Sequence, residues 1–327
     1  MSETDLPPSS PRRFTFLVNP VSGGGAGPRV VVPLARELRE AGCTVAVRYT
    51  GRIEETPALV AEALAGEPGE GAADDGESVV VAVGGDGMLS SVAGLVADAG
   101  GLLGLVPAGR GNDFARALGT PAETAALASL LRTGTPRSID LLDVGDTEGR
   151  RTVAGSVYTG VDARVAALVD RSRWLPSLLQ YPLASVACLA TYRPLHATVE
   201  IEGVDGTVSV SEHRVATVVV ANSPFYGKGM RIAPHAQVDD AALDIVIIEA
   251  AGRADLIRSL PKVYDGGHAA LPEVTLRRGR RVRVSGAFAG GTPAPVGADG
   301  EPLAPLPADH DRALEVTLRP GALRVLG

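Results

Sequence analysis

Cysteine and lysine are scarce in this chain of 327 residues. Its two cysteines, Cys43 and Cys188, both stand in apolar surroundings, which predicts buried thiols in a reducing compartment and argues against a disulfide or a sulfur-bound metal. Only Lys228 and Lys262 are lysine, so nearly every basic residue is arginine, which we attribute to genome composition. The five histidines show no spacing typical of metal ligands.

Targeting and membrane-spanning segments are not evident either. The opening residues MSETDLPPSSPRR have no apolar core, so we expect a flexible tail over residues 1–12 and no signal peptide. The longest apolar stretch, Leu178–Tyr192, is short for a membrane span and favours a buried or interfacial helix. A net charge of −7 argues against general nucleic-acid binding. These features predict a cytoplasmic protein.

Two common nucleotide-binding signatures are absent. The chain has neither the P-loop pattern GxxxxGK[ST] nor GxGxxG, which disfavours a dinucleotide fold of the dehydrogenase kind. Its composition, 45% apolar and 21% charged, is ordinary for a globular protein, and its length suffices for two domains with a substantial core.

Three glycine-rich turns do follow short apolar runs, at Asn19–Gly27, Gly84–Gly87 and Pro107–Asp113. Glycine lets the backbone approach an anion closely, and a following helix N-terminus offers free N–H groups. In an open parallel sheet all three turns fall at the carboxyl edge, where ligands bind. Because Asp86 and Asp113 would repel phosphate unless they bind a cation, take a proton or orient a neighbour, the pattern predicts phosphoryl chemistry.

Alternating strand and helix patterns over residues 13–137 predict a doubly wound α/β nucleotide-binding domain. The expected strands are Phe14–Val18, Thr44–Tyr49, Val79–Val83 and Leu102–Val106. Thr56 before Pro57 predicts the start of one helix, and Thr120-Pro-Ala-Glu123 predicts a capping box that opens another, to about Thr133.

From about Arg137 the sequence pattern changes to short β-rich runs separated by turns. This pattern predicts an antiparallel β-rich second domain over residues 138–318. The expected strands are Ser138–Val144, Thr152–Thr159, Ala197–Glu202, Arg214–Ala221, Leu243–Ile248, Val274–Leu276, Arg281–Val284 and Leu314–Leu318. Helices are expected near Ala163–Asp170, Leu178–Tyr192 and Ala254–Tyr264.

The motifs carry a family resemblance. NPVSGG at 19–24, GGDG at 84–87, PAGRGNDFARALG at 107–119 and DGE at 299–301 resemble those of the lipid kinases that include diacylglycerol and sphingosine kinases, with the bacterial soluble diacylglycerol kinases as the nearest branch. Weaker similarities follow in family order, at Gly160–Ala163, Ala221–Asn222, Tyr226–Met230, Pro234–Ala236 and Asp239–Asp244. The resemblance implies a fold similar to NAD kinases and lipid kinases, a lipid-binding second domain, and a last strand, about 319–327, that returns to the first domain.

The resemblance also implies an ATP site. The residues that it assigns to ATP are Asn19, Pro20, Val21, Ser22, Gly23, Thr50, Gly85, Asp86, Gly87, Met88, Arg110, Gly111, Asn112 and Asp113. Met88, Ser90 and Ser91 stand where the family commonly has Thr, Asn and Glu, so a hydroxyl donor to phosphate is missing. Arg110 replaces another Thr, and its guanidinium can bind phosphate bidentately or instead pair with Asp113 or Asp86.

Transfer of a phosphoryl group to an alcohol needs a carboxylate that accepts a proton late in the reaction. One residue separates Asp299 from Glu301, so a turn at Gly300 can aim both at one site. By resemblance Glu301 is the proton acceptor and Asp299 is its neighbour or a magnesium-linked group, while Asp86 is a rival for either role.

A magnesium site is implied in the Asp239–Asp244 segment. Asp240 resembles a family position that binds Mg²⁺, and backbone oxygens of Gln237 and Ala242 would complete the shell. Ala241 stands where the family usually has glycine, which matters if this position needs a positive φ.

These features lead us to expect an ATP- and Mg²⁺-dependent lipid kinase that phosphorylates a hydroxyl such as that of diacylglycerol and yields phosphatidic acid. Membrane contact at the inner membrane face would suit the mixed segment Arg171–Pro176, whereas the arginines of Arg277–Arg283 fit a solvated hairpin edge better. A kinase of a soluble acceptor (a polyol or NAD) and a non-catalytic nucleotide or lipid sensor remain alternatives. A homodimer through an edge strand is also open.

Overall fold

The computed structural model describes residues 12–20, 22–51, 53–65, 77–147, 149–171, 175 and 177–327. These divide into two compact units. The first unit holds the described residues up to Gly109, together with Gly119–Arg137 and Leu323–Gly327, and the second holds Arg110–Leu118 and Ser138–Ala322. Arg110–Leu118, which contains Gly111-Asn112-Asp113, therefore belongs to the second unit, although the segments before and after it belong to the first unit. The expected tail lies outside the described residues except for Arg12.

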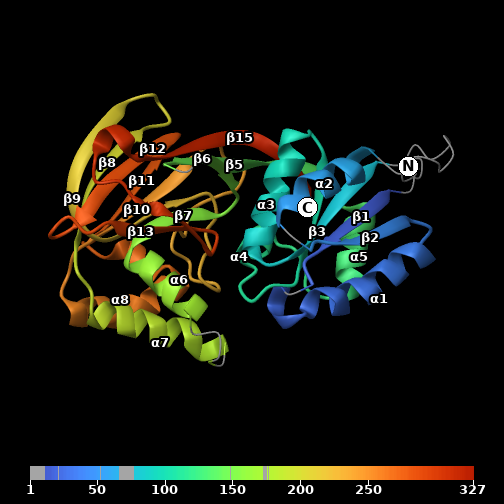
Figure 1. Ribbon diagram of the computed structural model, residues 1–327, viewed down its shortest axis with the longest axis horizontal. Helices are drawn as coiled ribbons and strands as arrows, with labels where there is room; N and C mark the ends of the chain where they lie inside the picture. The colour runs from blue at the N-terminus through green and yellow to red at the C-terminus, as the bar shows by residue number, and fades with distance from the viewer. Residues whose placement is uncertain are drawn as a thin grey trace, which may run out of the picture. The chain divides into compact units, whose positions relative to one another are not determined.

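The first unit is a parallel sheet covered by helices (Figure 1). Its strands run in the order β4-β3-β1-β2, and the end of β15 adds to the sheet beside β4. The strands are β1 (Arg13–Val18), β2 (Thr44–Tyr49), β3 (Ser78–Gly84), β4 (Leu102–Pro107) and β15 (Leu314–Leu326). The helices are α1 (Ala26–Glu40), α2 (Thr56–Ala65), α3 (Asp86–Asp98) and α5 (Thr124–Thr133). α1 packs on α5 and α2 on α3, so β3 between the helix pairs is an almost fully buried apolar run.

One predicted helix start is wrong. The capping box at Thr120 does not form, because α5 begins at Thr124 and Glu123 is its N-cap. Glu123 is extended, and its carboxylate accepts the backbone N–H groups of Ala125 and Ala126 at 3.0 and 2.8 Å. These hydrogen bonds lower the pKa of Glu123. The carboxylate of Glu123 thus caps two free N–H groups of α5, in place of the expected cap by Thr120.

The second unit is built on antiparallel strands. Its strands are β5 (Pro136–Asp146), β6 (Gly149–Val153), β7 (Ser156–Gly160), β8 (Leu195–Glu202), β9 (Val208–Ala221), β10 (Leu243–Glu249), β11 (Val274–Gly279), β12 (Arg281–Phe288), β13 (Ala294–Ala298), β14 (Glu301–Leu306) and the first part of β15. The long strand β9 pairs with β8, β7 and β10, so it joins the different parts of the sheet.

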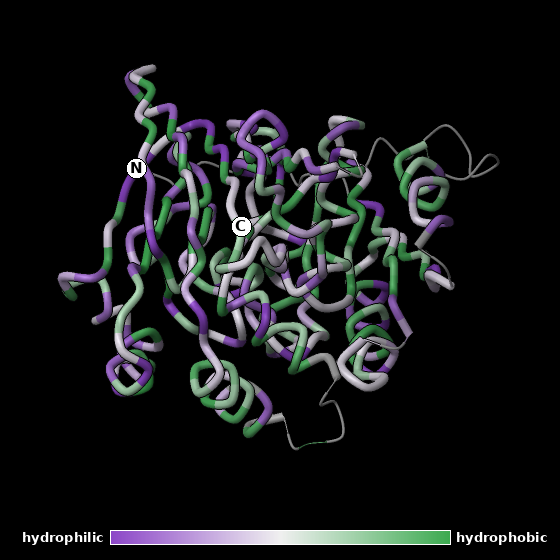
Figure 2. The backbone as a smooth tube through the Cα atoms, turned by 60° about the vertical axis from the view of Figure 1, so that its left-hand side comes forward, coloured by the Kyte–Doolittle hydropathy of each residue, from purple (hydrophilic) through white to green (hydrophobic). Residues whose placement is uncertain are grey.

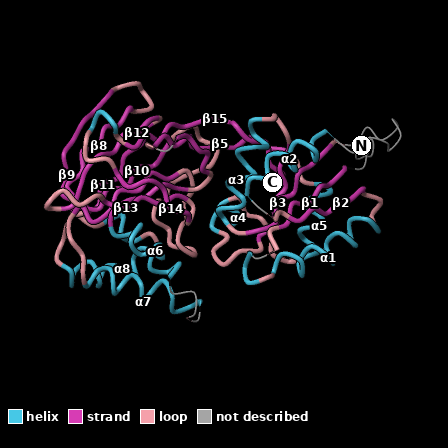
Figure 3. Tube along the Cα trace, in the orientation of Figure 1, coloured by secondary structure: helices cyan, strands magenta, loops and turns pink. Residues whose placement is uncertain are grey.

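The α-helices of the second unit's described residues are α4 (Asp113–Ala117), α6 (Val161–Arg171), α7 (Ser177–Ala190) and α8 (Arg253–Asp265). α6, α7 and α8 lie together on one side of the strands (Figure 3). Helices at the lower edge of Figure 2 carry both green and purple segments, as amphipathic helices do. Within the described part of the chain, no helix is both long and apolar enough to cross a membrane.

Candidate functional site

Three glycine-rich turns meet at the carboxyl edge of the first unit's parallel sheet. A Cβ on Gly23 would lie only 2.2 Å from the carbonyl oxygen of Ala108, and one on Gly85 would lie 3.3 Å from the Cα of Gly109. Gly23 also has a left-handed φ of +59°. Backbone therefore packs directly on backbone here, and the glycine at position 23 is required for both its conformation and its lack of a side chain.

Hydrogen bonds between neighbouring strands hold these turns in place. The N–H of Ala108 donates to the carbonyl of Gly84 at 2.9 Å, and the N–H of Asn19 donates to that of Val83 at 3.2 Å. At the same edge, the N–H of Thr50 donates to the carbonyl of Val18 at 2.9 Å. The three turns, and the end of β2, thus form one connected backbone cradle.

Two helices begin at this cradle without a side-chain cap. Gly25 precedes α1 and Gly85 precedes α3, and neither can offer a side chain to the first N–H groups of its helix. Such groups attract anions, and the positive end of the helix dipole adds to the attraction. Asp86, the first residue of α3, adds an oxygen donor for a cation that accompanies a polyphosphate. The cradle therefore fits the phosphates of a nucleotide.

The predicted ATP-binding residues fall in both units. Those in or beside the first unit's cradle are Asn19, Pro20, Ser22, Gly23, Thr50, Gly85, Asp86, Gly87 and Met88. Val21 lies outside the described residues. Arg110, Gly111, Asn112 and Asp113 belong to the second unit.

Asp113 is buried and holds α4 against the turn Tyr226–Met230. Its Oδ2 accepts the backbone N–H of Lys228 at 2.8 Å, and its Oδ1 lies 3.8 Å from Nη1 of Arg116. Burial raises the pKa of Asp113, and the N–H of Lys228, Arg116 and the N–H of Gly229 act in the opposite direction. The structure thus gives Asp113 a positioning role, and direct contact with a nucleotide stays a prediction.

Asp299 anchors the turn that carries Glu301. Its Oδ2 accepts the N–H groups of Ala154 and Gly155 at 3.0 and 3.1 Å, and its Oδ1 accepts that of Ser156 at 2.8 Å. Three backbone N–H groups therefore hold both oxygens of this carboxylate in place. Asp299 therefore fixes the hairpin to the residues before β7, which suits a positioning role better than proton transfer.

The Asp-Gly pair also sets the geometry of the hairpin. Ala298 of β13 pairs with Glu301 of β14, so Asp299 and Gly300 are the two turn residues. Their φ values are +45° and +88°, as a two-residue hairpin of the primed type requires. The N–H of Gly300 lies 3.2 Å from the hydroxyl oxygen of Tyr158. Glu301 follows this rigid turn with an exposed side chain, so its carboxylate is accessible to a substrate.

The predicted magnesium segment brings two carboxylates to one arginine. Oδ1 of Asp240 accepts the N–H of Ala242 at 3.2 Å, and its Oδ2 pairs with Arg278. Nε of Arg278 lies 3.9 Å from Oδ2 of Asp244, a buried atom with no hydrogen-bond partner among the described residues. Burial raises the pKa of Asp244 to about 6. The oxygen donors fit a hard cation such as Mg²⁺, which would replace Arg278 as their positive partner.

Ala241 takes the conformation that glycine would take at this position. Its φ is +57°, and its N–H donates to Oδ2 of Asp140 at 2.8 Å. The departure from the family's glycine is thus accommodated in the backbone. Among the described residues no group of three or more His, Cys, Asp or Glu side chains is arranged to hold a metal, so a magnesium ion here would rely on backbone oxygens and water.

Comparison with known proteins decides the family. The model of the diacylglycerol kinase catalytic domain matches residues 13–144, and that of the YegS C-terminal NAD kinase beta sandwich-like domain matches residues 155–327. A diacylglycerol kinase of Mycobacterium tuberculosis (strain CDC 1551 / Oshkosh) is 32% identical over 319 residues, which cover 96% of this chain and 94% of that protein. The chain belongs to the diacylglycerol kinase family of lipid kinases.

Further similarities agree with this. A Pseudomonas aeruginosa (strain PAO1) protein named probable lipid kinase YegS-like is 32% identical to this lipid kinase over 309 residues, with 93% and 91% of the two chains covered. A crystal structure of a diacylglycerol kinase from Bacillus anthracis str. Sterne shares the fold, with a TM-score of 0.65, 16% identity and 96% of both chains covered. The predicted family, enzyme class and two-domain α/β and β-rich fold are confirmed.

Asp162, near the start of α6, has a part-buried carboxyl group; in the sequence it stands out only within the weak similarity at Gly160–Ala163. The hydroxyl of Thr217 lies 2.6 Å from Oδ2 of Asp162 and 2.7 Å from the carbonyl of Thr159. One hydroxyl has a single proton, so it can donate to only one of these oxygens. Burial raises the pKa of Asp162, against the hydrogen bonds from Thr217 and Tyr226. If Asp162 is protonated, its carboxyl can donate to Thr217 while Thr217 donates to the carbonyl of Thr159, and both contacts are satisfied.

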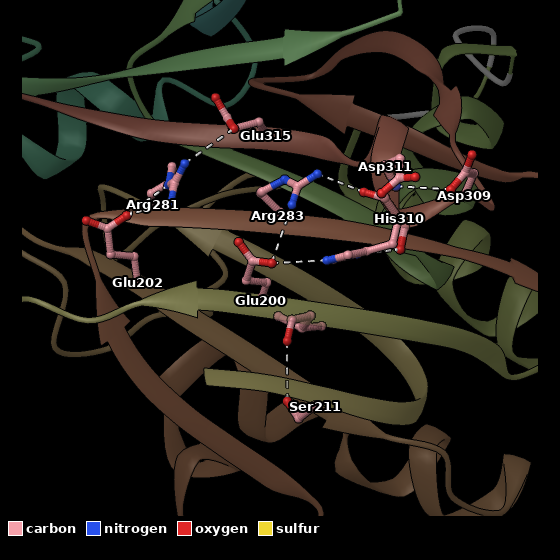
Figure 4. Close-up of polar contacts among 11 residues, drawn as sticks. Glu200, Glu202, Ser211, Arg281, Arg283, Asp309, His310, Asp311 and Glu315 are labelled. Carbon is pink, nitrogen blue, oxygen red and sulfur yellow. Dashed lines mark hydrogen bonds and ion pairs between the residues drawn. The ribbon is translucent and has the colours of Figure 1, made fainter. Parts of the chain in front are cut away.

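The arginine run pairs with carboxylates across the second unit's sheet (Figure 4). Arg281 binds Glu202 at 2.9 Å, and Arg283 lies 3.4 Å from Glu200. Nε2 of His310 lies 3.1 Å from Oε2 of the same Glu200, and this contact is the main reason that the pKa of Glu200 is lowered. Arg281 and Arg283 therefore pair with carboxylates on the sheet surface. The expected hairpin edge is wrong for them, because β12 pairs with both β8 and β15 and so lies inside the sheet, while β11 pairs with β10.

Proposed function

We propose that this lipid kinase transfers the γ-phosphate of ATP, with Mg²⁺, to the hydroxyl of diacylglycerol and releases phosphatidic acid. The near full-length similarity to the M. tuberculosis diacylglycerol kinase supports the acceptor. The observation that carries the chemistry is the exposed carboxylate of Glu301, placed on a hairpin that Asp299 fixes through three backbone hydrogen bonds.

Each part of the chain has a task in this proposal. The cradle around Gly23 and Gly85 binds and orients the phosphates, as backbone N–H groups do at glycine-rich turns. Glu301 accepts the proton of the lipid hydroxyl as the oxygen attacks phosphorus. Asp86 would hold Mg²⁺ beside the cradle, where the ion would neutralise phosphate charge, and Asp240 would hold a separate Mg²⁺ within the second unit. Asp299 keeps Glu301 in place.

A diacylglycerol acceptor lies in a bilayer, and α7 offers a surface that suits one. Leu179, Leu183 and Val186 are 48%, 49% and 44% exposed, and their spacing puts them on one face of the helix. α7 contains no charged residue. Such a face is typical of peripheral contact with a membrane surface, which fits a cytoplasmic enzyme at the inner face. Of the predicted contact Arg171–Pro176, residues 172–174 and 176 lie outside the described residues.

Vesicle sedimentation tests this contact. Leu179→Ser combined with Leu183→Ser should reduce binding to vesicles of phosphatidylglycerol and phosphatidylcholine several-fold. Val208→Ser combined with Val210→Ser is the matched control, because these side chains on β9 are 57% and 59% exposed. Equal binding by both double variants would refute a docking role of α7.

The acceptor is tested with labelled ATP and Mg²⁺ on a panel of micellar lipids, namely diacylglycerol, monoacylglycerol, ceramide, a sphingoid base and undecaprenol, beside glycerol and NAD. Transfer to diacylglycerol ahead of the others is expected. Transfer only to glycerol or NAD would show a soluble acceptor instead. ATP binding without transfer to any acceptor would support a sensor.

A further inference from the structure

Lys228 occupies a backbone position that suits glycine. It lies between Gly227 and Gly229, and the φ values of the three residues are +56°, +69° and +96°. A residue with a Cβ is disfavoured in this left-handed region, whereas glycine is not. The turn thus carries a long cationic side chain where none is needed for its shape, which suggests that the side chain itself has a use.

The ammonium group of Lys228 is held in a defined place. Its Nζ donates to Oε1 of Gln180 at 3.2 Å. Gln180 is only 2% exposed, and its own Nε2 donates to the carbonyl of Leu175 at 2.8 Å, which orients the amide oxygen toward the lysine. A neutral amide positions the ammonium group without cancelling its charge.

Positive charge gathers around this position. Burial lowers the pKa of Lys228, and the positive charge of Arg110 lowers it further. Arg116 lies 3.8 Å from Asp113, the carboxylate of this segment, and Oδ2 of Asp113 accepts the backbone N–H of Lys228. Arg110, Lys228 and Arg116 therefore interact with the charge of Asp113 or of one another, and Asp299 is the second carboxylate whose charge acts on Asp113. Cations that repel one another are stabilised when a dianion binds between them.

We propose that Lys228 and Arg110 form a phosphate-binding subsite of the second unit. The ligand is a phosphate monoester or terminal phosphate, supplied either by the nucleotide or by the phosphorylated lipid product. The subsite rests on the proposed function for its role in turnover, but its binding of phosphate is a property that can be measured without turnover. Arg110 was expected to bind phosphate from the sequence, and Lys228 is the addition that the structure makes.

The test uses Lys228→Gly in the full chain. Glycine suits the left-handed turn, so the variant should unfold at the same temperature as wild type or higher. Calorimetric titration with tripolyphosphate and, separately, with short-chain phosphatidic acid measures the subsite directly, and about a tenfold loss is expected for the true ligand, as one charge-assisted contact is lost. Loss with tripolyphosphate alone assigns the nucleotide, and loss with phosphatidic acid alone assigns the product.

Two further variants complete the design. Lys228→Arg should retain most of the binding, because it keeps the charge. Lys262→Met removes the other lysine, which is exposed on α8, and should bind both ligands as wild type does. Unchanged binding of both ligands by Lys228→Gly would overturn the proposal, and so would a lowered unfolding temperature with parallel loss in all assays. If no lipid is phosphorylated but phosphate binding still depends on Lys228, the proposed function fails and the subsite stands.

Discussion

Asp299 accepts a hydrogen bond from the backbone N–H of Ser156 at 2.8 Å, and this contact ties the hairpin of Glu301 to the start of β7. We predict that Asp299→Asn lowers stability by about 2 kcal/mol, because an amide cannot replace both charged oxygens. Asparagine tolerates a positive φ, so backbone strain would not explain the loss. Thermal unfolding measures it. An unchanged unfolding temperature would show that the three hydrogen bonds do not hold the turn.

The glycine cradle can be tested with two neighbouring residues. Gly23 and Gly24 both have left-handed φ values, +59° and +73°, so alanine strains the backbone at both. Only at position 23 would the new Cβ clash, 2.2 Å from the oxygen of Ala108, because a Cβ at 24 has nothing within 4 Å. Gly23→Ala should therefore raise the KM for ATP at least about tenfold, a loss of roughly 1.4 kcal/mol of binding. A similar rise in Gly24→Ala would mean that strain, not the cradle, is responsible.

Asp162 should show its protonation in the pH dependence of stability. Its folded pKa is raised above the unfolded value of 3.8, so the native state holds the proton more tightly. This raised pKa lowers the free energy of unfolding. The loss is absent below the pKa of the unfolded state and grows by about 1.4 kcal/mol per pH unit as the pH rises toward the folded pKa. Asp162→Asn removes this loss, since an amide donates to Thr217 in the same way.

Denaturant unfolding between pH 4 and pH 8 measures the difference between wild type and Asp162→Asn. The variant's advantage should grow with pH. An advantage that is constant or shrinks with pH would show that Asp162 is ionised in the folded protein.

Glu200 should behave in the opposite way. Its pKa is lowered, chiefly by His310, so its contribution to stability is present above the unfolded value and is lost as the pH falls through the folded value. Glu200→Gln should cost about 1 kcal/mol at pH 7 and nothing in acid. Glu212→Gln, an exposed carboxylate on β9, is the control. If Glu200→Gln is still less stable than wild type in acid, the loss of stability comes from packing and not from the charge of Glu200.

The sequence patterns predicted the parallel sheet well and the second unit less completely. β3 is a run of valine and alanine between two glycine-rich regions, so its limits follow from composition alone. β13 and β14 were not among the expected strands, because Pro295, Pro302 and Pro305 interrupt their patterns and proline is confined to edges and irregular positions of sheets. Thr152–Thr159 was expected as one strand, but it is broken at Ala154 and Gly155, whose N–H groups turn to Asp299.

The roles within the candidate site depend on contacts that no local pattern contains. Residue type and spacing do not separate Asp299 from Glu301, and only the family resemblance favours Glu301 as the base. The backbone partners of Asp299 identify it as an anchor, and the role of Glu301 as the base stays a prediction. In the sequence, Lys228 is only a lysine between two glycines. Its proposed phosphate-binding role is inferred from its positive φ and from its contact with Gln180, 48 residues away.

The most direct test of the account is the rate of phosphate transfer from labelled ATP to diacylglycerol by wild type and by Glu301→Gln. Glutamine keeps the size of an exposed side chain and should leave the unfolding temperature and ATP binding unchanged. We predict that kcat falls at least about 100-fold, because the variant cannot accept the hydroxyl proton. A kcat close to that of wild type would contradict the account and would shift the role of base to another carboxylate, with Asp86 the next to test.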